Sequence, residues 1–337
     1  MVRVSFLVAI FTAFLVSAIS GFVVIPWLRK LKYGQTINEI GPTWHQTKQG
    51  TPTMGGVMFI IGTLAGVIGG YCLLLNSDEV FMELMYQNQT TSLLISVITA
   101  MAFGLIGFVD DYIKDVKKRN LGLTEKQKLV LQFGVTIAFL VAQHLIGHLA
   151  TTVVIPFVGT VDLGIVYYPI VFAGILFMVN AVNLTDGIDG LCSSVTFIVS
   201  LGFLVISAAY GYYANSMFAC ALAGGLAGFL VWNFYPAKVF MGDTGSMFLG
   251  GAVVAMAWAV RRPEVLVIIG IIYTVEALSV VIQVTYFKLT HGKRIFKMSP
   301  IHHHYEMSGW SEVKIVWSFS AIAAIFGILA YAYMYAC

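Results

Sequence analysis

The chain has 337 residues, of which 59% are hydrophobic and only 10% are charged. A soluble domain of this length carries more charge, so the composition excludes that class and predicts an all-α polytopic membrane protein in contact with membrane lipid. The formal net charge of +3 points to no nucleic acid partner, and we expect none. The four cysteines lack the paired spacing of a disulfide framework, so we expect no disulfide.

Ten apolar runs predict ten transmembrane helices, at about 20 residues for each complete span. They fall at 4–26, 53–75, 92–109, 128–148, 167–182, 191–211, 217–232, 247–260, 266–287 and 313–335. The first run has no small-residue cleavage site, which indicates a retained helix and not a signal peptide. No internal repeat divides the chain, so we treat residues 1–337 as one membrane domain.

The basic residues predict the orientation of these spans. If the first helix starts outside the cytoplasm, the inner loops are 27–52, 110–127, 183–190, 233–246 and 288–312. Of the nineteen Lys and Arg residues, only Arg3, Arg261 and Arg262 then fall on the outer side. The positive-inside rule therefore places both termini outside the cytoplasm. On the outer side, the alternation around Gly159 in segment 149–166 predicts a small hairpin.

Two adjacent carboxylates, Asp110 and Asp111, end the third apolar run, and a basic loop follows them. Charged groups close to hydrocarbon are costly unless they reach water or have a function. On a continued helix Asp110 lies one turn from Lys114, and Asp111 lies one turn from Asp115, so the two carboxylates point in different directions. One would face the bundle and the other the loop. The alternative is a helix end with solvated charges.

Two further inner loops carry carboxylates. Asn180, Asn183, Asp186 and Asp189 recur every three residues, which aligns them along one side of a helix or turn. Asp243 lies between glycines that permit close approach of a ligand. Mg²⁺ is usually held by one or two carboxylates together with substrate phosphates, so we expect Asp243 to be a Mg²⁺ ligand. A structural polar turn is the alternative for the first group.

The remaining inner loops carry basic and histidine groups. Lys48 precedes a proline and a glycine pair at the start of the second span, and a helix N-terminus with a nearby lysine suits a phosphate. A simple helix cap is an equal alternative. The run His302–His304 does not predict zinc, because adjacent helical residues point about 100° apart. Phosphate binding or proton transfer suits these histidines better.

Carboxylates, basic groups and an apolar bundle together favour phosphoryl transfer onto a membrane-embedded lipid phosphate. A transporter is the rival from another class, since broken helices and intramembrane polar groups also mark transport sites. A transporter would place its polar residues near the bilayer midplane, whereas here they lie in loops on one face.

Five motifs carry a family resemblance: GTPTMGG at 50–56, FVDDY at 108–112, NLTDGIDGL at 183–191, NFYPAKVFMGDTGS at 233–246 and PIHHHYE at 300–306. In this order, from about residue 26 to residue 310, they resemble the phospho-N-acetylmuramoyl-pentapeptide transferases (the MraY family). These belong to the polyprenyl-phosphate hexosamine-1-phosphate transferase superfamily. A sister family that transfers GlcNAc-1-phosphate to the same lipid shares the aspartate loops and is an alternative.

The resemblance implies transfer of a phospho-sugar from UDP-MurNAc-pentapeptide to undecaprenyl phosphate, which yields lipid I and UMP. It also implies Mg²⁺ dependence, a homodimer, and a bacterial cytoplasmic membrane location with the active site facing the cytoplasm. The reaction would be a single displacement, with a two-step route through an aspartyl-phosphosugar as the alternative. In the family the ninth helix breaks to form a lipid groove, and Glu276 and Gln283 in run 266–287 are compatible with such a break.

The resemblance finally implies residue roles. Asp243 corresponds to the Mg²⁺ ligand, and Asp110 and Asp111 correspond to the catalytic pair, with Asp110 facing the lipid phosphate. His302 completes the catalytic set, and Phe240 corresponds to the uracil-stacking residue. The positions implied to bind substrate are Lys48, Thr53, Lys114, Lys126, Asn180, Asn183, Asp186, Asp189, Asn233, Phe240, Gln283, His303 and His304.

Overall fold

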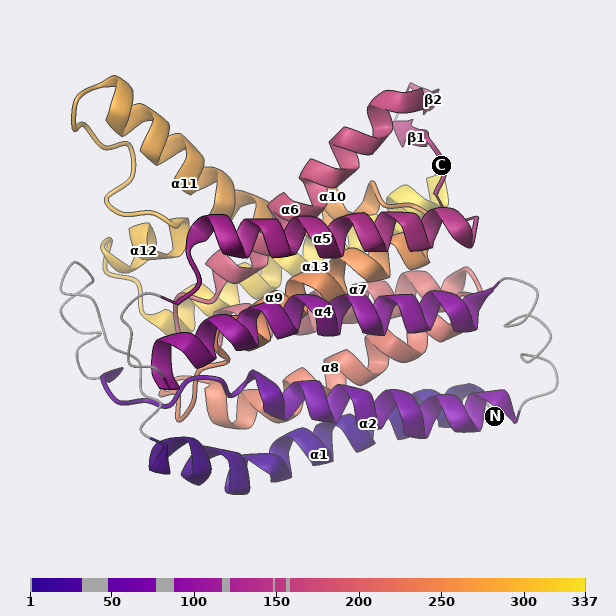
Figure 1. Ribbon diagram of the computed structural model, residues 1–337, viewed down its shortest axis with the longest axis horizontal. Helices are drawn as coiled ribbons and strands as arrows, with labels where there is room; N and C mark the ends of the chain where they lie inside the picture. Colours follow the sequence, from indigo (N-terminus) through magenta and orange to yellow (C-terminus); the bar gives the residue numbers. More distant parts are fainter. Residues whose placement is uncertain are drawn as a thin grey trace.

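The computed structural model describes residues 2–31, 48–76, 88–116, 122–147, 149–155 and 158–336. These residues form a bundle of helices with one small hairpin (Figure 1). The elements are α1 (Val2–Lys30), α2 (Gly56–Leu75), α4 (Gln89–Val116), α5 (Glu125–Leu145), β1 (Thr152–Ile155), β2 (Gly159–Asp162), η2 (Gly164–Val166), α6 (Tyr167–Thr185), α7 (Leu191–Ala209), α8 (Tyr213–Asn233), α9 (Gly242–Ala259), α10 (Val265–Ile269), α11 (Ile271–Leu289), α12 (Ile301–Glu306) and α13 (Glu312–Ala336).

Nine helices within the described ranges are long and apolar enough to cross a membrane. They match nine of the ten predicted runs, so the polytopic helical class is confirmed. The remaining run, 247–260, lies in α9, whose residues from Thr244 to Ala259 are all buried. Because other helices enclose it, α9 needs little lipid-facing apolar surface. The count of ten membrane spans stays a prediction.

Small residues bring α1 and α2 into close contact. On α2, Gly62, Gly66 and Gly70 recur every four residues and therefore share one face. A Cβ atom at Gly62 or Gly66 would overlap the backbone carbonyl of Ala13 or Ala9 on α1. Small residues at this spacing are typical of helices that pack tightly within membranes. This contact stabilises the N-terminal edge of the bundle.

The contact between α4 and α9 positions the acidic residues. A Cβ atom at Gly107 of α4 would overlap the backbone of Asp243, and one at Gly251 of α9 would crowd Phe103. These glycines let the two helices approach closely and run antiparallel. The last turns of α4, with Asp110 and Asp111, therefore lie beside the first turn of α9.

The structure has a break within run 266–287, where the family resemblance implied one. Gly270 separates α10 from α11, and α11 then leaves the bundle (Figure 1). Glu276 and Gln283, the polar residues of this run, lie after the break, inside the continuous helix α11. Both side chains contact the segment that follows: Glu276 Oε2 contacts His302, and Gln283 accepts the backbone N–H groups of Ile295 and Phe296.

The hairpin predicted in segment 149–166 is confirmed. Strands β1 and β2 pair antiparallel, with Thr152 opposite Asp162 and Ile155 opposite Gly159. Both chain ends lie at the end of the bundle that also carries this hairpin (Figure 1), as an even number of spans requires. The membrane side of the termini stays a prediction. The basic residues Lys32, Lys117, Lys118 and Arg119, on which that prediction partly depends, lie outside the described residues.

Candidate functional site

Three carboxylates converge where α4 ends and α9 begins. Asp110, Asp111 and Asp243 each offer an oxygen within 4.8 Å of the others. Asp110 and Asp111 are only 2% and 5% exposed, so these charges lie away from bulk water. Carboxylate oxygens are the donors that Mg²⁺ prefers, and the cluster offers no sulfur or imidazole group to favour zinc. The donor set therefore fits Mg²⁺, and it is larger than the single ligand, Asp243, that the sequence predicted.

The two adjacent aspartates have different partners, as their helical spacing predicted. Asp110 accepts the backbone N–H of Leu123 at 2.7 Å, in the loop before α5, and pairs with Lys114. Asp111 faces α9, where it accepts the N–H of Thr244 at 2.8 Å and its hydroxyl at 2.6 Å. Asp111 thus satisfies backbone groups at the N-terminus of α9, where a negative charge is also favoured by the helix dipole.

Asp243 is surrounded by cations and amides. Its Oδ2 lies 2.9 Å from both the Lys114 and Lys128 ammonium groups, and Asn183 donates to its Oδ1 at 2.8 Å. Burial alone would raise the pKa of Asp243, but the hydrogen bond with Asp110 and the charges of Lys128 and Lys114 hold that pKa well below its usual range. Asp243 is therefore a carboxylate, the form that binds a metal or orients a lysine.

The polar residues predicted to align along segment 180–189 contact different parts of the structure. Asn183 also donates to Ser246 at 2.7 Å, and so stays with the carboxylate cluster. Asn180 instead pairs with Gln132 of α5 at 2.7 Å. Asp186 caps the end of α6. Burial, together with the charges of Asp243, Asp111 and Asp189, raises the pKa of Asp186 to about 8.

The segments that precede α2 and α9 are joined by backbone hydrogen bonds. Phe240 donates its N–H to the Pro52 carbonyl at 2.9 Å and accepts the N–H of Gly55 at 2.8 Å. Thr53 lies beside Gly242, next to the cluster. Asn233 is 1% exposed, and its amide bonds Ser193 and the Val239 carbonyl. Asn233 therefore links the segment that contains Phe240 to α7.

The three consecutive histidines lie on α12 and face three different partners. His302 Nδ1 lies 2.9 Å from Glu276 Oε2, and His303 Nδ1 lies 2.6 Å from Glu306 Oε2. His304 Nδ1 accepts the backbone N–H of Lys297 at 3.1 Å. The rings of His302 and His303 lie 4.1 Å apart, but their Nδ1 atoms face different carboxylates, and the absence of a zinc site stays a prediction. The His302 ring is buried against Gly187, a residue of the turn that also contains Asp186 and Asp189.

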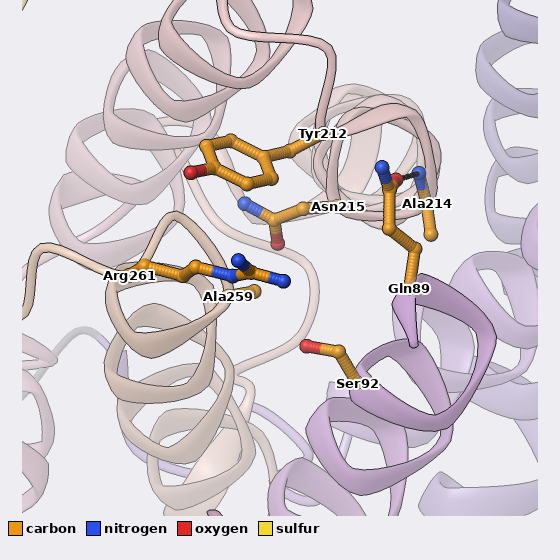
Figure 2. Close-up of a pocket in the computed structure, with 7 residues that line it drawn as sticks. All are labelled: Gln89, Ser92, Tyr212, Ala214, Asn215, Ala259 and Arg261. Carbon is orange, nitrogen blue, oxygen red and sulfur yellow. Dashed lines mark hydrogen bonds between the residues drawn. The ribbon is translucent and has the colours of Figure 1, made fainter. Parts of the chain in front are cut away.

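A polar cavity occupies the opposite end of the bundle. Figure 2 shows it between the first turns of α4 and α8 and the end of α9, lined by Gln89, Ser92, Tyr212, Ala214, Asn215, Ala259 and Arg261. Gln89 and Asp110 lie 21 residues apart on α4, which corresponds to about 30 Å at 1.5 Å per residue. With about 10 Å³ the cavity has room for one water molecule, so it is not the substrate site.

Comparisons with known proteins match the same segments. The model of glycosyl transferase family 4 matches residues 93–261, and the phospho-N-acetylmuramoyl-pentapeptide-transferase signature 1 matches residues 48–60. A phospho-N-acetylmuramoyl-pentapeptide-transferase of Clostridium perfringens is 44% identical over 336 residues, which cover 98% of this chain and 99% of the relative. Proteins of the same name from Halalkalibacterium halodurans and Bacillus licheniformis are also 44% identical, over 96% of each chain.

The chain belongs to the phospho-N-acetylmuramoyl-pentapeptide-transferase family. The family resemblance predicted from the five motifs is confirmed, and the chain is a transferase. The two matched segments contain Lys48 and all three clustered carboxylates. The His302–His304 run lies beyond both segments but within the full-length similarity.

Several residues at the site were not predicted from the sequence. Lys128 contacts Asp243, whereas the predicted Lys126 is exposed at the start of α5. Thr244 and Ser246 bond Asp111 and Asn183, and Glu312 pairs with Lys48 at 2.6 Å. The motif containing Asp243 was a signal for Thr244 and Ser246. No local pattern distinguished Lys128 or Glu312.

Proposed function

We propose that this transferase acts in bacterial peptidoglycan synthesis, transferring phospho-N-acetylmuramoyl-pentapeptide from UDP-MurNAc-pentapeptide to undecaprenyl phosphate. The products would be lipid I and UMP, made at the cytoplasmic face of the bacterial cytoplasmic membrane. The observation that carries the proposal is the convergence of Asp110, Asp111 and Asp243 with two lysines at one end of the bundle. The names of the full-length relatives support the sugar and peptide part of the donor.

The proposed reaction is a single in-line displacement. An oxygen of the lipid phosphate forms a bond to the β-phosphorus of the donor, while the bond from that phosphorus to the bridging oxygen breaks and UMP leaves. A phosphate monoester has its second pKa near about 6, so the acceptor is already largely a dianion at cytoplasmic pH. We therefore assign Asp110 to orienting the acceptor phosphate or to removing the proton from the minor fraction that is still a monoanion.

The basic groups around the cluster would hold the phosphates. Lys114 and Lys128 already lie 2.9 Å from Asp243, and their remaining N–H groups suit the oxygens of a pyrophosphate. Mg²⁺ held by Asp243 with Asp110 and Asp111 would neutralise developing negative charge on the phosphates. Phe240, which is partly exposed at the segment paired to Pro52, is the proposed stacking surface for uracil.

The lipid acceptor would reach this site along α11. This helix leaves the bundle and exposes Val275, Leu278, Val281 and Ile282. An apolar, exposed helix face beside the carboxylate end suits a polyprenyl chain whose phosphate stops at the cluster. We also propose a homodimer, which rests on the family resemblance.

The test is a reconstitution of the purified protein with UDP-MurNAc-pentapeptide, undecaprenyl phosphate and Mg²⁺. We expect UMP release that requires the lipid phosphate and stops when the metal is chelated. UDP-GlcNAc in place of the natural donor should give no product, and a result favouring UDP-GlcNAc would assign the sister family's substrate. Donor flux across vesicles without UMP release would favour the transporter.

Two further measurements address the mechanism. Asp243→Ala should abolish UMP release, and full release by this variant would refute the metal assignment. Trapping a phosphosugar covalently bound to Asp110 or Asp111, with donor present and acceptor absent, would replace the single displacement by the two-step route.

A further inference from the structure

The ammonium group of Lys48 lies between two carboxylates from distant parts of the chain. Its Nζ donates to Asp189 Oδ1 and to Glu312 Oε2, both at 2.6 Å. Asp189 is 2% exposed and Glu312 is 8% exposed, so both acids are nearly removed from water. Isolated charges in such positions are costly, and each carboxylate therefore depends on its hydrogen-bond partners.

Glu312 does more than pair with the lysine. The same oxygen, Oε2, accepts the backbone N–H of Asp189 at 2.9 Å. Asp189 in turn accepts the N–H of Ala237 on its other oxygen at 2.8 Å. The Glu312 carboxylate thus connects Lys48 and the turn before α7, and Asp189 extends the connection to the segment after α8.

The position of Glu312 on a long helix makes this connection rigid. It is the first residue of α13, a helix of 25 residues that packs along α7. A carboxylate in the first turn of a helix is favoured by the helix dipole. The Lys48 side chain has four rotatable bonds, so fixing it in one geometry costs conformational entropy. Two carboxylates on a rigid support fix the lysine before the substrate arrives.

We propose that Glu312 is a positioning residue of the donor site, which holds the Lys48 ammonium beside Asp189. An ammonium has three donors. Two are used by the carboxylates, and the third has no partner within the described ranges, so it suits an oxygen of the donor nucleotide. This inference rests on the proposed function, because it takes Lys48 as a residue of the donor site. It assigns to Glu312 an effect on donor affinity and none on the lipid acceptor.

The first experiment compares donor and acceptor binding in Glu312→Gln. The dissociation constant for UDP-MurNAc-pentapeptide, measured by calorimetry without acceptor, should rise about tenfold. The KM for undecaprenyl phosphate should stay within about twofold of the wild-type value. Glu264→Gln is the matched control, since Glu264 also pairs with a basic residue, Arg262, but at the other end of the bundle. Unchanged donor affinity, or equal losses for donor and acceptor, would overturn the proposal.

A double-mutant cycle separates positioning from a general structural effect. If Glu312 acts through Lys48, the variant that combines Lys48→Met with Glu312→Gln should bind donor as weakly as Lys48→Met alone. If the two losses of donor affinity multiply in the double variant, so that their free energies are additive, the proposal is overturned. If Glu312→Gln does not fold, Glu312→Asp serves in its place, because it keeps the charge but shortens the reach to Lys48. A wild-type protein that releases no UMP would refute the proposed function, whereas an active wild type with additive losses refutes this inference alone.

Discussion

His302 and Glu276 form a hydrogen bond of 2.9 Å between two side chains that have no exposed surface. One proton lies between the two groups, and this bond fixes the orientation of the imidazole ring. His302 Nε2 has no hydrogen-bond partner among the described residues and lies against Gly187. The pair therefore links α11, the helix that leaves the bundle, to the turn that carries Asp186 and Asp189.

Removing the carboxylate should impair catalysis through His302. In Glu276→Ala the imidazole loses the group that orients it, and we expect kcat for UMP release to fall roughly 10- to 100-fold, as for other carboxylates that orient a functional histidine. Glu276→Gln keeps an acceptor for Nδ1–H and should retain more activity than the alanine variant. Wild-type turnover by Glu276→Ala would show that the pair has no part in the reaction.

Gly187 should not tolerate a side chain. A Cβ atom at this position would overlap His302 Nε2, which cannot retreat because the ring is buried. We expect Gly187→Ala to lower UMP release by about tenfold or more, the cost of about 1.4 kcal/mol of misplacement. Gly134→Ala is the control, since nothing lies within 4 Å of its Cβ position on α5. Equal activity of the two variants would place His302 away from the reaction.

Lys126 and Lys128 provide a matched test of the carboxylate cluster. Lys128 lies 2.9 Å from Asp243 and 3.7 Å from Asp110, whereas Lys126 is exposed. We expect Lys128→Met to reduce kcat/KM for the donor about tenfold or more, because the partly buried Asp243 carboxylate loses one of its two lysine partners. Lys126→Met should change it by less than about threefold. The reverse order would restore Lys126 as the substrate-binding residue predicted from the sequence.

The raised pKa of Asp186 predicts how stability depends on pH. Burial and three neighbouring carboxylates raise that pKa from the usual range of an aspartate, near 4, to about 8. The folded protein then holds this proton over a range in which the unfolded chain has released it, so Asp186 makes the free energy of unfolding decrease as pH rises from about 4 to about 8. Thermal unfolding without Mg²⁺ or donor should show Asp186→Asn gaining stability relative to the wild type across this range. A constant difference would contradict the raised pKa.

The sequence predicted the elements whose signal is local. Apolar runs gave the helices, and alternation around Gly159 gave the hairpin between β1 and β2. The helical spacing at Asp110 and Asp111 correctly predicted partners in two directions. In each of these cases the pattern repeats within a few residues, so chain geometry alone determines which groups share a face.

Features that depend on the contact between distant segments were not predicted. Lys126 and Lys128 look alike in the sequence, and only the rotation of α5 against α4 decides which one meets Asp243. Glu312 follows a serine at the start of a helix, a pattern typical of a solvent-facing helix start, yet it is buried against Lys48. Gly270 interrupts a helix within an apolar run, and no polar residue marks it.

The enclosed position of α9 has a consequence for how the protein is assembled in the membrane. A helix that is short, rich in glycine and alanine and carries an aspartate in its first turn gains little from contact with lipid alone. Its stability comes from packing against α4 and α6, which precede it in the chain. We therefore expect α9 to enter the bilayer against helices that are already inserted. The carboxylate cluster would then form late in biogenesis, and a chain that stops before residue 242 would be membrane-bound but inactive.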